Sequence, residues 1–255
     1  REEAYHHRLK QLNDSSRPAE GVASIHDRVT VKEEGLDKFL WYDRHRRVSL
    51  RDQFLANDTT LETFAHCQHH EGGDFVDGAY QSRIRRGKGR QTLELFREGH
   101  LLANGQKVPL LVSKTFPLPS TGAKLEVLYR LENRSERPIS CWFGVELNFA
   151  LLAGDAPDRN YWIAGADLKD PRLASSGQTD QVSSFGLRDE YLGLEIALAL
   201  DKPATLWRFP IETVSQSEGG FERVYQSSVV FPNWKLELKA GGVWEMLLVQ
   251  EIGKL

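Results

Sequence analysis

The sequence has few cysteines and no long apolar run. Only two cysteines occur in 255 residues, Cys67 and Cys141, which is too few for a disulfide framework. Such a composition is typical of a reducing compartment, so we expect a cytoplasmic location. No apolar run of about 18 residues could span a membrane, and the first residues carry no signal-peptide pattern. We therefore expect no membrane partner.

Positive charge is not in excess. The chain carries 33 Lys and Arg against 36 Asp and Glu, a net charge of −3. The two signs are interspersed and leave no basic stripe of the kind that nucleic-acid binding requires, so we exclude nucleic acid as the main partner. With 40% apolar and 10% aromatic residues, the composition is that of an ordinary globular protein.

Helical periodicity is confined to the start of the chain. Residues 1–12 are charged and place several apolar side chains near one helical face, which predicts a short helix. The residues after Asn13 have turn composition and indicate a boundary. We assign residues 1–20 to a short helix and linker, the tail of a preceding helical domain, and residues 21–255 to one β domain. Because the chain begins with Arg rather than Met, we expect further sequence upstream.

The longest alternating segment is residues 139–152. Its odd positions are apolar without exception, which predicts a strand with one face in a core. Its even positions place Trp142, Glu146 and Asn148 in a row on the opposite face. Two interpretations are open: a second packed interface around a satisfied buried carboxylate, or a polar platform that meets a sugar or another domain.

Shorter alternating segments fill most of the remaining chain, and almost no helix is expected after Asn13. A hairpin is predicted around the basic residues 44–47, and residues 123–133 are expected to pair with the long strand across the turn at 133–138. About a dozen strands predict an all-β fold, a β-sandwich. The main predicted strands are residues 36–43, 48–55, 92–96, 108–116, 123–133, 139–152, 192–200, 205–210, 234–238 and 243–252.

Two segments have the composition of long loops, residues 57–88 and residues 155–181. The first contains His66, Cys67, His69 and His70, whose side chains are of the type that zinc prefers. These four residues lie too close together in sequence for a closed tetrahedral site without help from elsewhere. We therefore interpret the segment as a solvated loop and assign no metal.

Four motifs resemble a known family. They are WYDRHRRVSLRDQFL at 41–55, FGVELNFALL at 143–152, IETVSQSEGGFERVYQ at 211–226 and WKLELKAGGVW at 234–244. In this order they resemble the C-terminal domain of the α-amylase and 4-α-glucanotransferase branch of glycoside hydrolase family 57, over nearly the whole chain. The resemblance implies a twisted β-sandwich of the supersandwich, galactose-mutarotase-like type.

The resemblance also implies where the chemistry takes place. Full-length members of the family act on α-1,4-glucans by a retaining mechanism, and both catalytic carboxylates belong to an N-terminal barrel domain. This chain shows no barrel pattern, which would need about 200 residues of alternating strands and helices. The resemblance thus implies a non-catalytic domain without a cofactor, whose partner is the catalytic barrel of the same polypeptide.

Within the chain, carboxylates are the residues to examine, because retaining glycosidases use a pair of them about 5 to 5.5 Å apart. Glu212 and Glu218 lie in a segment that we expect to be loop-rich, with a glycine pair that permits a tight turn. We assign no catalytic residue. We expect Trp142, Glu146, Asn148, Glu212 and Glu218 to contact the barrel or to border the glucan path.

Two other functions stay open. A stand-alone aldose mutarotase or epimerase would need a carboxylate, Glu146 or Glu218, and a histidine that face each other over a sugar ring. An independent carbohydrate-binding module would stack glucose rings on tryptophans such as Trp142, Trp162 and Trp234.

Overall fold

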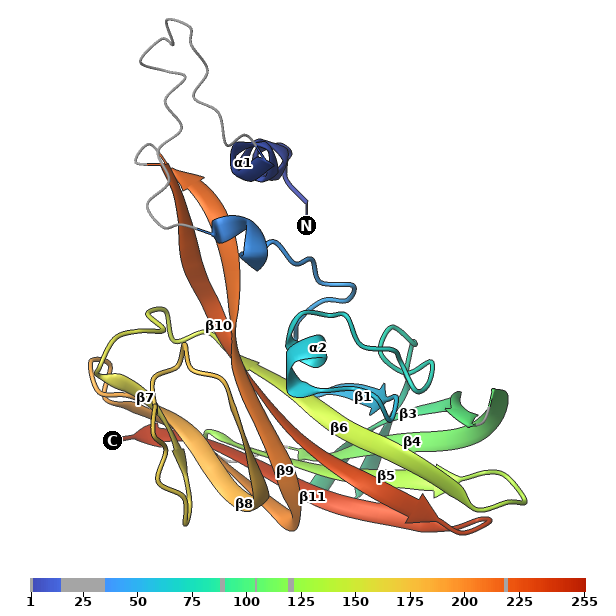
Figure 1. Cartoon of the computed structure of the whole chain (residues 1–255). Coiled ribbons are helices and arrows are strands. Elements are labelled where there is room, and N and C mark those ends of the chain that lie inside the picture. The colour runs from blue at the N-terminus through green and yellow to red at the C-terminus, as the bar shows by residue number, and fades with distance from the viewer. Residues whose placement is uncertain (1, 15–34, 88–89, 104, 119–121, 218–219) are drawn as a thin grey trace, which may run out of the picture.

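The computed structural model describes residues 2–14, 35–87, 90–103, 105–118, 122–217 and 220–255. Most of these residues belong to one antiparallel β-sheet that folds back on itself (Figure 1). Among them, no helix has both the length and the apolar character needed to cross a membrane.

Eleven strands, two α-helices and one 3₁₀-helix make up this part of the chain. In chain order they are α1 (Ala4–Asp14), η2 (Leu36–Phe39), β1 (Arg51–Leu55), α2 (Leu61–Ala65), β2 (Gln81–Gly87), β3 (Arg90–Ala103), β4 (Gln106–Leu118), β5 (Lys124–Asn133), β6 (Ile139–Phe149), β7 (Arg159–Ile163), β8 (Gly177–Asp189), β9 (Leu194–Ser217), β10 (Gly220–Leu238) and β11 (Val243–Lys254). The sheet runs in the order β1, β6, β10, β9, β11, β5, β4, β3, β2, while β8 pairs with β9 and β7 pairs with β8.

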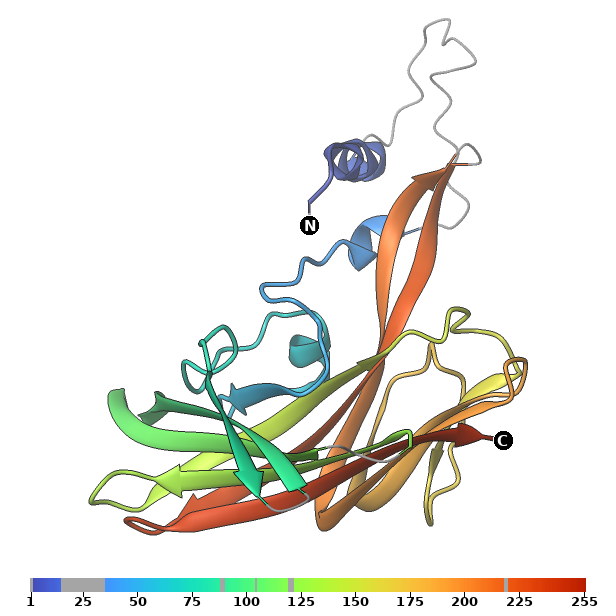
Figure 2. The same ribbon diagram turned by 180° about the vertical axis from the view of Figure 1, so that it is seen from behind.

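The 24-residue strand β9 joins the two layers of the molecule. Its first part, residues 194–200, pairs with β11, and its later part, residues 205–217, pairs with β10. One layer therefore contains β1, β6 and β10, and the other contains β11, β5, β4, β3 and β2. Figure 2 shows the second layer from behind, with β6 on its far side. The predicted all-β sandwich is confirmed.

The main core lies between the layers, and the odd positions of β6 face it as predicted. Phe143, Val145 and Leu147 are fully buried. They belong to one apolar cluster with residues of β4, β5 and β11, and the Phe143 ring lies 6.0 Å from that of Tyr129 on β5. Close packing of this kind explains why every odd position in the strand is apolar.

A second apolar cluster covers the outer face of β6, β9 and β10. The helix α2 places Phe64 against Phe231, with their rings stacked 4.3 Å apart. Gly144 makes this possible, because a Cβ at this position would lie 2.1 Å from Cζ of Phe231. The even face of β6 is therefore packed under α2 and its neighbouring loops instead of facing solvent.

The far ends of β9 and β10 extend beyond the sandwich as a two-stranded arm, residues 212–217 paired with 220–225 (Figure 1). A register shift between Tyr225 and Ser227 separates the arm from the rest of β10. The helices α1 and η2 pack on the arm through a third small cluster that includes Leu9, Val214 and Phe221.

The expected hairpin around residues 44–47 is wrong. Residues 36–39 form η2 instead of a strand, and β1 pairs with β6. The same apolar spacing that suggested alternation also fits one 3₁₀ turn, because Leu36 and Phe39 are three residues apart and both pack on the arm.

The expected pairing of β5 with β6 is also wrong. β5 pairs with β4 and β11, whereas β6 pairs with β1 and β10 in the other layer. The connection crosses between the layers. The side-chain amide of Asn133 fixes this crossing, because it donates to the backbone oxygens of Arg137 at 2.7 Å and Lys239 at 2.9 Å.

Four segments that were interpreted as loops or as separate strands contain regular elements. Residues 57–88 contain α2 and β2, and residues 155–181 contain β7 and the start of β8. The segment around Glu212 is the arm, not a loop-rich region, and the strands predicted at 192–200 and 205–210 are one strand, β9.

Candidate functional site

Glu146 lies at the centre of a buried polar network on the outer face of β6. Its Oε2 is 3.1 Å from Nε2 of His45 and accepts from the Gln53 side-chain amide at 3.0 Å. Its Oε1 accepts from the Asn148 amide at 2.9 Å and lies 3.5 Å from a guanidinium nitrogen of Arg47. Of the five members, only Arg47 and Asn148 are not fully buried.

Charge and hydrogen bonding decide the ionisation of Glu146. Burial by itself would raise the pKa of this carboxyl, but the hydrogen bond with His45 and the charge of Arg47 outweigh it, and the pKa is lowered from its ordinary value. The group is therefore an ionised, satisfied carboxylate. Two interpretations of the even face of β6 were open. For Glu146 the interpretation as a buried, satisfied carboxylate is correct, because this residue has no exposed surface.

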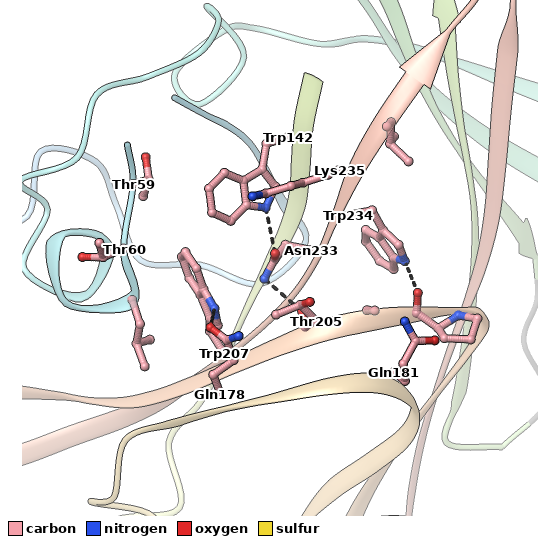
Figure 3. A pocket seen from close by; sticks show the side chains of 14 residues that line it. Thr59, Thr60, Trp142, Gln178, Gln181, Thr205, Trp207, Asn233, Trp234 and Lys235 are labelled. Carbon is pink, nitrogen blue, oxygen red and sulfur yellow. Dashed lines mark hydrogen bonds between the residues drawn. The ribbon is translucent and has the colours of Figure 1, made fainter. Parts of the chain in front are cut away.

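The other member of that face, Trp142, reaches a surface pocket of about 570 Å³. We call it the tryptophan pocket. Figure 3 shows Trp142, Trp207 and Trp234 arranged around Asn233. The pocket is lined by Thr59, Thr60, Leu61, Trp142, Gln178, Gln181, Pro203, Ala204, Thr205, Trp207, Asn233, Trp234, Lys235 and Leu236.

The indoles of the tryptophan pocket are held in place by their N–H groups. Trp142 donates to the side-chain oxygen of Asn233 at 2.8 Å, and Trp207 donates to that of Gln178 at 2.8 Å. Trp234 donates to the backbone oxygen of Pro203 at 2.9 Å. Because these donors are used internally, the indoles offer a ligand apolar surface and no hydrogen bond.

A second, smaller pocket of about 240 Å³ lies where α1 and residues 39–43 meet the arm. We call it the arm pocket. Glu212 lines it, and the Glu212 carboxylate is 3.4 Å from a guanidinium nitrogen of Arg223 across the two strands. His6 and Tyr42 also line it, and the Tyr42 hydroxyl lies 3.1 Å from Nδ1 of His6. Glu218 lies outside the described residues.

The structure thus places the four described members of the five expected contact residues in three different sites. Glu146 and Asn148 share the buried network, Trp142 belongs to the tryptophan pocket, and Glu212 belongs to the arm pocket. The two described carboxylates among them, Glu146 and Glu212, belong to different sites.

The histidines and cysteine at 66–70 have separate partners. His66 stacks on Trp41 with ring centroids 3.5 Å apart, and the Cys67 sulfur accepts from Arg47 at 3.0 Å. His69 is buried, with Nε2 3.3 Å from the Glu71 carboxylate. Within the described part of the chain, no group of three or more His, Cys, Asp or Glu side chains could hold a metal.

Sequence reasoning missed much of the tryptophan pocket. Trp162, which was grouped with Trp142 and Trp234, lies on β7 outside this pocket, where Arg188 covers its ring at 5.5 Å. Trp207, Gln178 and Lys235 were not singled out. The alternation within residues 205–210 could have assigned Trp207 to the same face as Phe209, but the bend that brings β8 to this site is a long-range feature.

Comparison with known proteins identifies the family. Residues 1–248 match the family described as alpha-amylase/4-alpha-glucanotransferase, C-terminal. The chain belongs to this family of C-terminal domains of glycoside hydrolase family 57.

Relatives of this C-terminal domain carry two activities in their names. Over 244 residues it is 35% identical to alpha-amylase 1 of Dictyoglomus thermophilum, which covers 96% of this chain and 33% of that protein. It is 30% identical over 236 residues to the 4-alpha-glucanotransferase of Thermococcus litoralis, covering 90% and 31%. The chain therefore spans about a third of the length of these relatives.

Solved structures support the same fold. The crystal structure of the Thermococcus litoralis 4-alpha-glucanotransferase matches with a TM-score of 0.65 and 27% identity, over 88% of this chain and 30% of that one. A galactose mutarotase-like protein from Clostridium acetobutylicum matches with a TM-score of 0.53 and 10% identity, over 82% and 79%. The galactose-mutarotase-like architecture is confirmed, and at this identity the second match concerns the fold alone.

Proposed function

We propose that this chain is a non-catalytic domain of an α-1,4-glucan-active enzyme. In this proposal it packs on the catalytic barrel of the same polypeptide through α1 and the arm, and the arm pocket borders the glucan path. The observation that carries the proposal is the seating of α1 on the arm, outside the sandwich.

The contact between α1 and the arm is specific. Leu9 and Phe221 are buried in it, and both the Tyr5 hydroxyl and Nε2 of His6 lie 3.3 Å from the backbone oxygen of Val214. A two-stranded hairpin is at best marginally stable in water without cover. The helix α1 therefore stabilises the arm by covering one of its faces.

The arm also has a second face. Directly opposite residues in an antiparallel pair share a face, so Thr213 and Val224 point away from Val214 and α1. Both are half-buried. A hairpin that projects from its domain with one face covered and one face partly open supports docking of a further domain there.

The stand-alone epimerase alternative is not favoured by the geometry. Such chemistry needs a carboxylate and a histidine with a sugar ring between them. Of the two carboxylates in that hypothesis, Glu146 is described. Its Oε2 lies at hydrogen-bond distance, 3.1 Å, from Nε2 of His45, and both side chains are buried. No space for a sugar separates them.

Two measurements test the proposal. The purified chain is incubated with maltoheptaose, and the products are separated by chromatography; we expect neither hydrolysis nor transfer. The polypeptide encoded upstream in the same gene is then titrated with the chain by calorimetry, and we expect a saturable complex.

A matched pair of variants locates the contact. Val224→Arg places a charge on the open face of the arm and should weaken the complex by about tenfold or more, since one desolvated or clashing charge costs more than about 1.4 kcal/mol. Val243→Arg makes the same change at an exposed position at the start of β11 and should leave the affinity unchanged. Product formation by the chain alone would refute the non-catalytic role, and equal affinities of the two variants would refute docking at the arm.

A further inference from the structure

We propose that the tryptophan pocket binds a glucosyl unit of an α-1,4-glucan. The identity of the sugar rests on the proposed function, whereas the pocket and its chemistry rest on the geometry of β6, β8, β9 and β10. No residue of the buried Glu146 network lines this pocket.

The lining has the composition of a site for a neutral, hydroxyl-rich ligand. Its volume of about 570 Å³ is within the usual range for small-molecule sites, about 300 to 1,000 Å³. Trp142 and Trp234 are each 8% exposed and Trp207 is 2% exposed, so the indoles supply a limited apolar surface, of the kind that packs on the C–H faces of a sugar ring. Amide and hydroxyl groups supply hydrogen bonds, and no carboxylate is among the lining residues.

Hydrogen bonds, partly at the exposed edge of the pocket, hold its polar groups in place. The Asp180 carboxylate accepts from the Thr205 hydroxyl at 2.8 Å and from the Gln178 amide at 3.3 Å. Asn233, which holds Trp142, also donates to the backbone oxygen of Thr205 at 2.9 Å. Because these side chains are already held by hydrogen bonds, a ligand loses less binding free energy to ordering them.

Backbone strain at the rim points to a role for Gln181. This residue has a φ of 59°, in the left-handed region that non-glycine residues rarely adopt, and it is exposed. It lies within the register shift between Thr179 and Val182 in the pairing of β8 with β9, and a second shift follows between Val182 and Ser184. A β-bulge changes the direction in which nearby side chains point, and bulges are frequent next to functional sites. The Gln181 amide has no hydrogen-bond partner within the described chain, so both its donor and its acceptor are available.

Lys235 is the part of the site that a ligand would displace. Its ammonium lies 4.4 Å from the centroid of the Trp142 ring, where a sugar face would stack (Figure 3). Lys235 is exposed, and a cation–π contact at an exposed site is weak. Displacing this side chain therefore costs little free energy, and it exposes more of the Trp142 ring.

The test is a titration of the full chain with maltoheptaose, followed by calorimetry and by tryptophan fluorescence. Three of the six tryptophans line the pocket, so binding there should change the emission. We expect saturable binding in the millimolar range, and much weaker binding of a cello-oligosaccharide of similar length. The absence of saturable binding would overturn the site, and equal binding of both sugars would overturn the α-1,4-glucan assignment.

Three variants tie the binding to this pocket. Gln181→Gly removes the amide and relieves the φ strain, so the chain should be as stable as the wild type or more stable while its affinity falls by about tenfold. Lys235→Ala uncovers Trp142 and should raise the affinity about 2- to 5-fold, which corresponds to a contact of about 0.5 to 1 kcal/mol. Leu152→Gly relieves a similar φ of 58° at an exposed residue outside the pocket and should leave the affinity unchanged.

These outcomes are independent of the tests of the proposed function. If maltoheptaose binds but neither Gln181→Gly nor Lys235→Ala changes the affinity, the glucan site is elsewhere and the inference is overturned. If the chain does not bind maltoheptaose, the proposed docking at the arm is unaffected. If the chain does not dock through the arm, the proposed sugar binding in the tryptophan pocket is unaffected.

Discussion

Replacing Glu146 by glutamine perturbs the one fully buried carboxylate on β6 with almost no change in shape. Four side chains point hydrogen-bond donors or positive charge at this group. A glutamine amide would place its own NH₂ against at least one of these donors. The variant also removes a negative charge beside Arg47, whose side chain is only 7% exposed.

The cost of Glu146→Gln follows from these contacts. Removing one partner of a buried ion pair costs about 3 to 5 kcal/mol. Arg47 keeps a second carboxylate, since Asp43 lies 2.8 Å from its Nε, so we expect the lower end, about 3 kcal/mol. For a chain of this size, that loss corresponds to a decrease in Tm of roughly 6 to 12 °C.

Urea unfolding at neutral pH, followed by circular dichroism, measures this difference. Glu237→Gln is the matched control, because Glu237 is an exposed glutamate on the neighbouring strand β10, and it should change the free energy of unfolding by less than about 0.5 kcal/mol. If Glu146→Gln is as stable as the control, the network does not contribute as the geometry indicates.

The pH dependence supplies a second check on Glu146. Its pKa is lower in the folded chain than in the unfolded chain, so ionised Glu146 stabilises the fold above the unfolded pKa, about 4.3. That contribution is lost as the pH falls through the folded pKa. The wild type should therefore exceed Glu146→Gln by the full margin at pH 7, and the margin should shrink below about pH 4. A margin that stays constant in acid would refute an ionised Glu146.

Three further predictions concern packing and thiol reactivity. Gly144→Ala should lower the free energy of unfolding in urea by about 1 to 3 kcal/mol, because the new Cβ would lie 2.1 Å from the immobile Phe231 ring; a neutral change would mean that this ring can move. Phe143→Ala should cost about 3 to 5 kcal/mol in the same assay, as expected for a fully buried ring. Loss of hydration raises the pKa of the half-buried Cys141 to about 12 and also raises that of the buried Cys67. Iodoacetamide should therefore label both thiols rapidly only in denaturant, and rapid labelling of the native chain would contradict the raised pKa values.

Local patterns predicted the features that depend on local chemistry. The apolar odd positions of residues 139–149 required a buried face, and Phe143, Val145 and Leu147 are buried. The turn predicted from the glycine pair after Glu218 lies outside the described residues. The order of strands was not predictable in this way. A short connection after Asn133 favours adjacent pairing, but the same length of chain can cross between two layers. The deciding contact, from Asn133 to the backbone near Lys239, joins residues 106 positions apart.

Neither the arm nor the tryptophan pocket could be predicted from the sequence, and the reason is the same for both. The polar, glycine-containing segment around Glu212 has the composition of a loop, yet it forms strands because α1, about 200 residues earlier, covers Val214 and Phe221. Trp207 and Gln181 become neighbours of one pocket only through the pairing of β8 with the middle of β9. Neither relationship leaves a periodic signal in the sequence.

The two faces of β6 show how a strand can be buried on both sides and still contribute to a surface site. Glu146 is closed off by His45 and Gln53, and Gly144 admits the Phe231 ring, so the middle of the even face is filled from above. Towards the start of the strand, Trp142 is only 8% exposed. Its ring lies 5.5 Å from that of Trp207 and 4.4 Å from the Lys235 ammonium, and it lines the tryptophan pocket. The buried Glu146 network holds β6 in place, and it therefore also holds the Trp142 indole at the edge of the tryptophan pocket. If the pocket binds glucan, loosening the network through Glu146→Gln should weaken maltoheptaose binding without any contact between Glu146 and the sugar, and unchanged binding in a folded Glu146→Gln variant would separate the two sites.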